Sequence, residues 1–188
     1  MHKLGLTAIL ACGPLVALAD PAAWIGEAHS VATSVPPKLL AVLKAEIEKG
    51  GPEGAIAVCS EVAPKLAAEA SQATGWQVRR VSLRNRNPRA VPDDWERAVL
   101  EDFDRRAAAG ENPATLERAE EVVVDGKPVW RYMRALPTQE LCLACHGPRE
   151  RLGEGVRAQL GARYPADRAV GYSVGQIRGA MTIRKPQP

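Results

Sequence analysis

The segment LCLACHG at residues 141–147 constrains this 188-residue chain more than any other feature of its sequence. It places Cys142 and Cys145 two residues apart, and His146 follows the second cysteine directly. The sequence holds four cysteines, of which Cys12 lies in an apolar stretch near the N-terminus. Removal of that stretch would leave three cysteines, an odd number that internal disulfides cannot pair completely. At least one cysteine is therefore expected to have another role.

The first 19 residues have the pattern of a secretory signal peptide. Lys3 gives a weakly basic start, residues 4–18 are mostly apolar, and Ala17-Leu18-Ala19 forms a small-x-small cleavage site. An apolar stretch of about 15 residues is shorter than the roughly 20 that a membrane-spanning helix needs. Lipid attachment at Cys12 is a minor alternative, because the residues before it include a bulky one. The prediction is a periplasmic or otherwise exported protein with no stable membrane span after cleavage.

The spacing of the two cysteines has a chemical interpretation. Two thiols separated by two residues can add to the two vinyl groups of one haem, and His146 then lies under the iron as its proximal ligand. A redox dithiol, half of a zinc site and a plain disulfide are the alternatives. A zinc site would need Cys59 and His29 as further ligands. Because c-type haem is attached in the export compartment, the sequence favours one covalently attached haem c.

Four side chains are candidates for the opposite axial ligand of the iron: Cys59, His29, Met133 and Met181. The two methionines lie in strand-like segments, where methionine usually packs in a core. His29 precedes a proline pair, in a stretch where an exposed histidine is ordinary. A free cysteine also commonly packs as a small apolar residue. Spacing alone does not choose among the four.

The apolar pattern predicts both helices and strands. Helices are expected before Gly50-Gly51, between residues 52 and 75, and between residues 94 and 110, whereas Pro36-Pro37 and Pro64 predict breaks. Strand-like segments lie at 76–83, 121–124 and 127–135 and from about residue 176 to 183. Asp125-Gly126 predicts a two-residue hairpin. The expected organisation is a signal peptide (1–19), a separate N-terminal segment (20–37) and one domain (38–188).

Four sequence blocks carry a family resemblance: GGPEGAIAVCSEVAP at 50–64, RRVSLRNRNPRAVPDDWE at 79–96, RYMRALPTQELCLACHG at 131–147 and YPADRAVGYSVGQIRGAM at 164–181. Over residues 39–183 the chain resembles a family of single-haem c-type proteins with a PAS-like fold, formerly classed as a domain of unknown function. Members of that family occur alone or as sensor modules of signalling receptors.

The resemblance implies an α+β fold, with a PAS-like antiparallel sheet flanked by helices and one covalently bound haem c. It makes Cys142 and Cys145 the thioether residues, His146 the proximal ligand and Cys59 the opposite axial ligand. Family members tend to begin with a longer continuous helix, so Pro36-Pro37 is a departure from the family pattern. This departure leaves the haem site itself unaffected.

A thiolate ligand stabilises ferric iron, so His/Cys ligation predicts a haem of low reduction potential. With both axial positions filled by protein there is no open place for a substrate, so we expect no enzymatic activity. Low-potential electron transfer is the expected function. The alternative is a redox or gas sensor that signals through a separate partner protein.

The remaining partners are less constrained by the sequence. Arg84 and Arg86 are candidates for binding the haem propionates, with a solvated loop as the equal alternative. No basic run exceeds two residues and there is a single phenylalanine, so nucleic-acid binding is not indicated. Nothing in the sequence identifies the redox partner or the oligomeric state.

Overall fold

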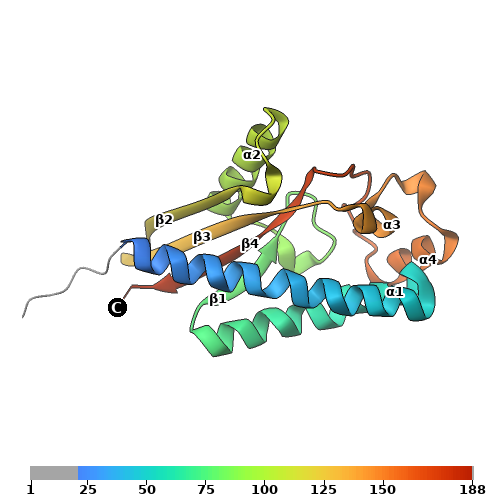
Figure 1. The fold of residues 1–188 in the computed structure, drawn as a ribbon, viewed down its shortest axis with the longest axis horizontal. Helices are drawn as coiled ribbons and strands as arrows, with labels where there is room; N and C mark the ends of the chain where they lie inside the picture. The colour runs from blue at the N-terminus through green and yellow to red at the C-terminus, as the bar shows by residue number, and fades with distance from the viewer. Residues whose placement is uncertain (1–20, 188) are drawn as a thin grey trace, which may run out of the picture.

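The computed structural model describes residues 21–187, in which one antiparallel sheet is flanked by helices (Figure 1). The elements are α1 (Pro21–Thr74), β1 (Gln77–Val81), α2 (Asp94–Ala108), β2 (Glu117–Val124), β3 (Lys127–Pro137), α3 (Leu143–His146), α4 (Glu154–Arg163) and β4 (Ile177–Pro186), with short 3-10 turns at Pro88–Ala90, Pro113–Thr115, Glu140–Cys142 and Arg149–Arg151. This confirms the α+β class. The predicted signal peptide lies outside the described residues.

Helix α1 is a hairpin of two arms that run back along each other (Figure 1). The arms meet at Gly50 and Gly51, which are the only residues of α1 with non-helical backbone angles. Gly51 has φ +70°, a conformation that favours glycine. The helix stop predicted at this pair is therefore confirmed, and so is the end before Gly75.

The helix breaks predicted at Pro36-Pro37 and Pro64 are wrong. Backbone angles stay helical through all three prolines. A proline inside a helix costs about 3 kcal/mol, because it removes one hydrogen bond and crowds the preceding turn. Burial offsets that cost for the first pair, since Trp24, Ala28 and Val35 of the same arm lie in a core cluster with the sheet.

The boundary predicted between residues 37 and 38 is likewise absent, because α1 crosses it as one helix. The arm before this point belongs to the domain rather than to a separate segment. Trp24 stacks on Trp130 of β3 with ring centroids 5.6 Å apart, and Trp76 also stacks on Trp130, with ring centroids 6.3 Å apart. No helix in the described part of the chain is long and apolar enough to cross a membrane.

The sheet has the strand order β1-β4-β3-β2, with every neighbouring pair antiparallel. Asp125 and Gly126 join β2 to β3 with φ +51° and +75°, as the hairpin signal predicted. Alternation along β3 then separates two cores. Tyr132 packs on the α1 side, whereas Met133 packs on the α2 side with Phe103.

Gly179 of β4 lies so close to β1 that a side chain has no room there. Its φ is +151°, and a Cβ atom would lie 2.3 Å from the carbonyl oxygen of Val81. We expect Gly179→Ala to lower the free energy of unfolding by more than about 2 kcal/mol, because both strain and a backbone clash oppose it. Gly161→Ala in α4 is the matched control, since nothing lies within 4 Å of its Cβ position. Urea unfolding measures both, and equal stability of the two variants would contradict the close packing of β4 on β1.

Candidate functional site

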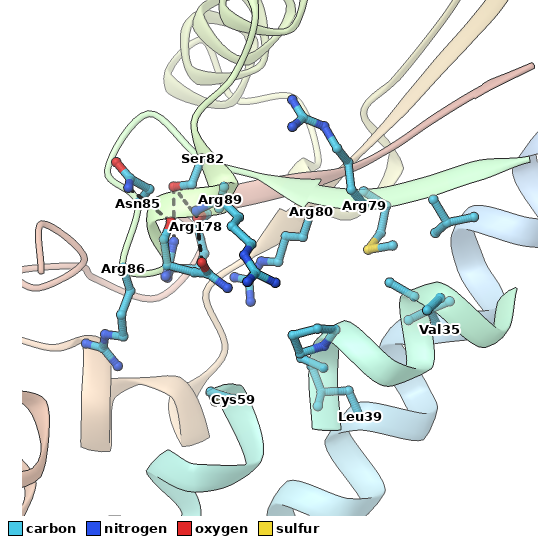
Figure 2. A pocket seen from close by; sticks show the side chains of 18 of the residues that line it. Val35, Leu39, Cys59, Arg79, Arg80, Ser82, Asn85, Arg86, Arg89 and Arg178 are labelled. Carbon is cyan, nitrogen blue, oxygen red and sulfur yellow. Dashed lines mark hydrogen bonds between the residues drawn. The ribbon is translucent and has the colours of Figure 1, made fainter. Parts of the chain in front are cut away.

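A cavity of about 550 Å³ lies between α1 and the face of the sheet formed by β1 and β4 (Figure 2). This volume falls within the range of ordinary ligand and cofactor sites. Its apolar wall comes from both arms of α1 and from the sheet, and includes Val35, Leu39, Ala67, Val78 and Met181. Its polar wall includes a thiol, an imidazole and several guanidinium groups. The cavity therefore suits a mostly apolar ligand with anionic groups.

His146 reaches the cavity from α3. Its Nδ1 lies 2.7 Å from the carbonyl oxygen of Ala169, which can only accept, so Nδ1–H is the donor and Nε2 carries a lone pair. Burial and the positive charges of Arg178 and Arg86 hold the pKa of His146 well below its usual value. The imidazole is thus neutral, with its orientation fixed by the Ala169 carbonyl. This is the usual state of a metal-binding histidine.

Cys59 lines the same cavity from the second arm of α1 (Figure 2). The structure thus brings the thiol of Cys59 and the imidazole of His146 to one space, although the two residues are 87 positions apart in the chain. The other three candidate axial ligands differ in whether they reach this cavity. Met181 also lines the cavity, whereas Met133 lies in the core on the α2 side of the sheet. His29 lies elsewhere, with its Nδ1 3.0 Å from a carboxylate oxygen of Glu117.

Cys142 and Cys145 precede His146 in the chain but are not among the residues that line the cavity. The thiol of Cys145 lies 3.8 Å from the carbonyl oxygen of Pro52, and burial raises its pKa to about 11. The thiol of Cys142 accepts a hydrogen bond from the backbone N–H of Gln139 at 3.4 Å. Cys59, Cys142 and Cys145 are all free, so no disulfide joins the described cysteines.

The zinc alternative lacks the ligands it needs. In residues 21–187 no three histidine, cysteine, aspartate or glutamate side chains gather in a group able to hold a metal ion. A structural zinc ion needs four such ligands. His29, which the zinc reading required, is engaged with Glu117 and with the hydroxyl group of Tyr132. The cluster that this alternative needs is therefore not formed.

A buried ion pair fixes the backbone around His146. The side chains of Arg86 and Asp167 are 5% and 6% exposed, and Arg86 Nε donates to Asp167 Oδ1 at 3.1 Å. Arg86 Nη2 also donates to the carbonyl oxygens of Cys145, at 2.6 Å, and Ala169, at 3.2 Å. Asp167 accepts from the backbone N–H of Ala169 at 2.8 Å. The pair therefore holds the carbonyl that orients the imidazole of His146.

Arg84 and Arg86, the arginines that the sequence suggested for propionates, are both engaged by the protein. Arg84 donates to the carbonyl oxygen of Val170, and its guanidinium lies 4.0 Å from the ring centroid of Tyr172. Arg86 lines the cavity together with Arg80 and Arg178, which sequence reasoning missed. The strand period was a usable signal for Arg80, because it lies two residues after the buried Val78 and so shares its face.

Fold and site together define an α+β protein whose internal cavity presents an imidazole, a thiol and a cationic wall. The sequence pattern of the Tll0287-like family matches residues 19–186. The crystal structure of the cyanobacterial heme-protein Tll0287 is similar, with a TM-score of 0.55 and 33% identity over 70% of this chain and 73% of that chain. No curated protein matches the chain. The chain belongs to the Tll0287-like family, which confirms the resemblance read from the sequence blocks.

We expect Asp167→Asn to lower the free energy of unfolding by about 3 to 5 kcal/mol, because it leaves the Arg86 charge buried without a partner. Asp102→Asn is the control, since it removes an exposed pair with Arg105, and such pairs contribute at most about 1 kcal/mol. Urea unfolding of the two variants at neutral pH measures the difference. Similar losses for both would show that the buried pair does not fix this part of the fold.

Proposed function

We propose that this chain is an exported c-type haem protein with His/Cys axial ligation that acts in low-potential electron transfer. In this proposal Cys142 and Cys145 carry the haem through thioether bonds, and His146 and Cys59 are the two axial ligands. The observation that carries it is the meeting of Cys59 and His146 at one cavity. The solved relative is a cyanobacterial heme-protein, which supports the same cofactor.

The residues around the cavity fit a haem chemically. A neutral imidazole with Nδ1–H held by a carbonyl has its lone pair on Nε2, which would bind iron in place of the 3.4 Å hydrogen bond that it accepts from Arg178 Nε here. The apolar wall formed by Val35, Leu39 and Val78 suits the faces of a porphyrin, and guanidinium groups suit its carboxylates. When bound, haem supplies one-electron exchange between ferric and ferrous iron. This chain orients the imidazole, supplies the thiol and limits the access of water.

The position of the two motif cysteines next to His146 in the chain supports attachment of the haem through them. Cys142 and Cys145 lie on the turn and short helix that end at His146, so one local segment would provide both thioethers and the proximal ligand. Export of the chain through the N-terminal signal would deliver it to the compartment in which such attachment occurs.

Two protein ligands on the iron leave no open position for a substrate, so we propose no enzymatic activity. Such a site can cycle electrons with both ligands retained, as an electron carrier does. The second candidate function is a redox or gas sensor, in which reduction releases Cys59 and an external ligand binds. The redox partner would be a separate protein in either case.

Cys59→Ala tests the axial ligand. If Cys59 binds the iron, its removal shifts the Soret band of the ferric holoprotein and opens a coordination position. Met181→Leu is the matched control, because Met181 lines the same cavity and its replacement leaves the thiol in place. Visible spectra are recorded for protein made with haem-maturation machinery. A spectrum that changes with Met181→Leu and ignores Cys59→Ala would transfer the ligand role to the methionine.

Carbon monoxide distinguishes the two candidate functions in the same preparation. An electron carrier that keeps Cys59 bound after reduction has no free position, so the ferrous spectrum stays unchanged under carbon monoxide. A carbon monoxide complex of the ferrous wild type would instead support the sensor.

The thioether bonds are tested by denaturation. In the wild type, haem stays with the polypeptide through denaturing electrophoresis, because covalent bonds survive unfolding. The double change Cys142→Ala and Cys145→Ala is expected to lose all of this haem stain, while Cys59→Ala keeps it. Haem stain that persists without the two motif cysteines would contradict covalent attachment at these positions.

A further inference from the structure

The cavity wall carries more positive charge than the protein itself neutralises. Five arginines line the cavity, and no aspartate or glutamate among the described residues does. Arg79 and Arg86 are already paired with carboxylates that lie outside the cavity wall. The other three, Arg80, Arg89 and Arg178, form no ion pair with any described carboxylate. Three positive charges in one cavity repel one another, and a bound anion would reduce this repulsion.

Arg80 and Arg89 differ from Arg178 in having free donors. Arg178 is 6% exposed, and its guanidinium donates to the hydroxyl oxygen of Ser82 at 3.0 Å and contacts the ring of His146. The guanidinium groups of Arg80 and Arg89 make no hydrogen bond within residues 21–187. Figure 2 shows both side chains extending from the sheet side into the space that Cys59 borders from α1.

The chemistry of these free donors selects carboxylates. A guanidinium presents its N–H groups in a planar fork that fits a carboxylate with two parallel hydrogen bonds. The apolar wall opposite the arginines favours a ligand whose carboxylates are attached to a large apolar body. Haem has this form, with two propionate groups at one edge of the porphyrin.

We propose that Arg80 and Arg89 form a carboxylate clamp that holds the two propionates of the haem. This inference rests on the haem function proposed above. The clamp takes the propionate-binding role that the sequence suggested for Arg84 and Arg86. Those two arginines instead hold the backbone around His146 and Tyr172. Because covalent attachment uses other residues, the clamp sets the position of the propionate edge and the charge around it, and it is not needed to retain the haem.

The test uses ferric and ferrous holoprotein of Arg80→Gln and Arg89→Gln. Arg97→Gln is the matched control, because Arg97 is exposed on α2, forms no ion pair and lies outside the cavity wall. Resonance Raman spectra report the bending mode of the propionates, which responds to their hydrogen bonds. We expect this band to move in Arg80→Gln and Arg89→Gln and to match the wild type in Arg97→Gln.

The reduction potential gives a second readout. Positive charge near the haem stabilises the reduced form, which carries one more electron. Loss of one guanidinium is expected to shift the ferric-to-ferrous ratio about tenfold toward the ferric form at a fixed electrode potential, or about 59 mV for a one-electron couple. Arg80→Lys keeps the charge and loses the planar fork, so its potential stays near the wild type while its Raman band moves.

Several outcomes would overturn the clamp. An unchanged propionate band in both glutamine variants, with haem attached and the axial spectrum intact, refutes it and leaves the haem function standing. The same donors would also suit a diffusible dicarboxylate, so succinate is added to the wild-type holoprotein. A saturable spectral shift with succinate that Arg80→Gln abolishes would show a diffusible ligand in place of the propionates. A wild-type protein that acquires no haem would instead refute the function on which the clamp rests.

Discussion

The buried pair between Arg86 and Asp167 connects the parts of the chain that have no regular secondary structure. Arg86 comes from the loop after β1, and Asp167 comes from the loop between α4 and β4. Their hydrogen bonds also reach the carbonyl oxygens of Cys145 and Ala169, so α3 is held between the two loops. Two opposite charges attract strongly in a low-dielectric interior. Their attraction offsets the cost of removing them from water only when their remaining hydrogen bonds are satisfied. The orientation of His146 therefore depends on charges that lie outside its own helix.

Helix α1 likewise depends on both local backbone geometry and contacts with residues distant in the sequence. Its first arm is held by the stacked indole rings of Trp24 and Trp130, and it stays helical through Pro36 and Pro37. Its second arm has fewer buried residues, but it carries Cys59 to the cavity wall. The reversal at Gly50-Gly51 places a thiol from the second arm in the wall of a cavity that Val35 and Leu39 line from the first arm. The hairpin thus builds both the core and one side of the site.

The sequence was a good guide wherever a signal is local. The glycine pair at 50–51 and the Asp125-Gly126 hairpin each act through their own backbone angles. The helix breaks predicted at the prolines were wrong because the free-energy cost of a proline is local, whereas the burial of the helix involves distant residues. A pattern of apolar residues shows which face is buried, yet it does not state how much free energy the partner surface supplies.

The arginines show the same limit at the site. The segment from residue 79 to residue 89 contains five of them and no acid, so the sequence does not distinguish among them. Asp167 makes the distinction, because it neutralises Arg86 across 81 positions of sequence. The motif cysteines and His146 could be grouped without knowledge of distant partners, because they lie within five consecutive residues. Residue type and spacing thus point to candidate ligands more readily than they distinguish the charged groups around them.

The charges of the cavity bear on the choice between an electron carrier and a sensor. A thiolate ligand favours ferric iron, and release of the ligand on reduction is easier when the thiolate takes up a proton. In the proposed haem site, Cys59 would share its cavity with five arginines, and a nearby cation stabilises a thiolate over a thiol. The same cation stabilises the additional negative charge of a reduced site. Both effects would oppose loss of Cys59 on reduction, so the cationic wall supports the proposal of a haem that exchanges electrons with its two protein ligands retained.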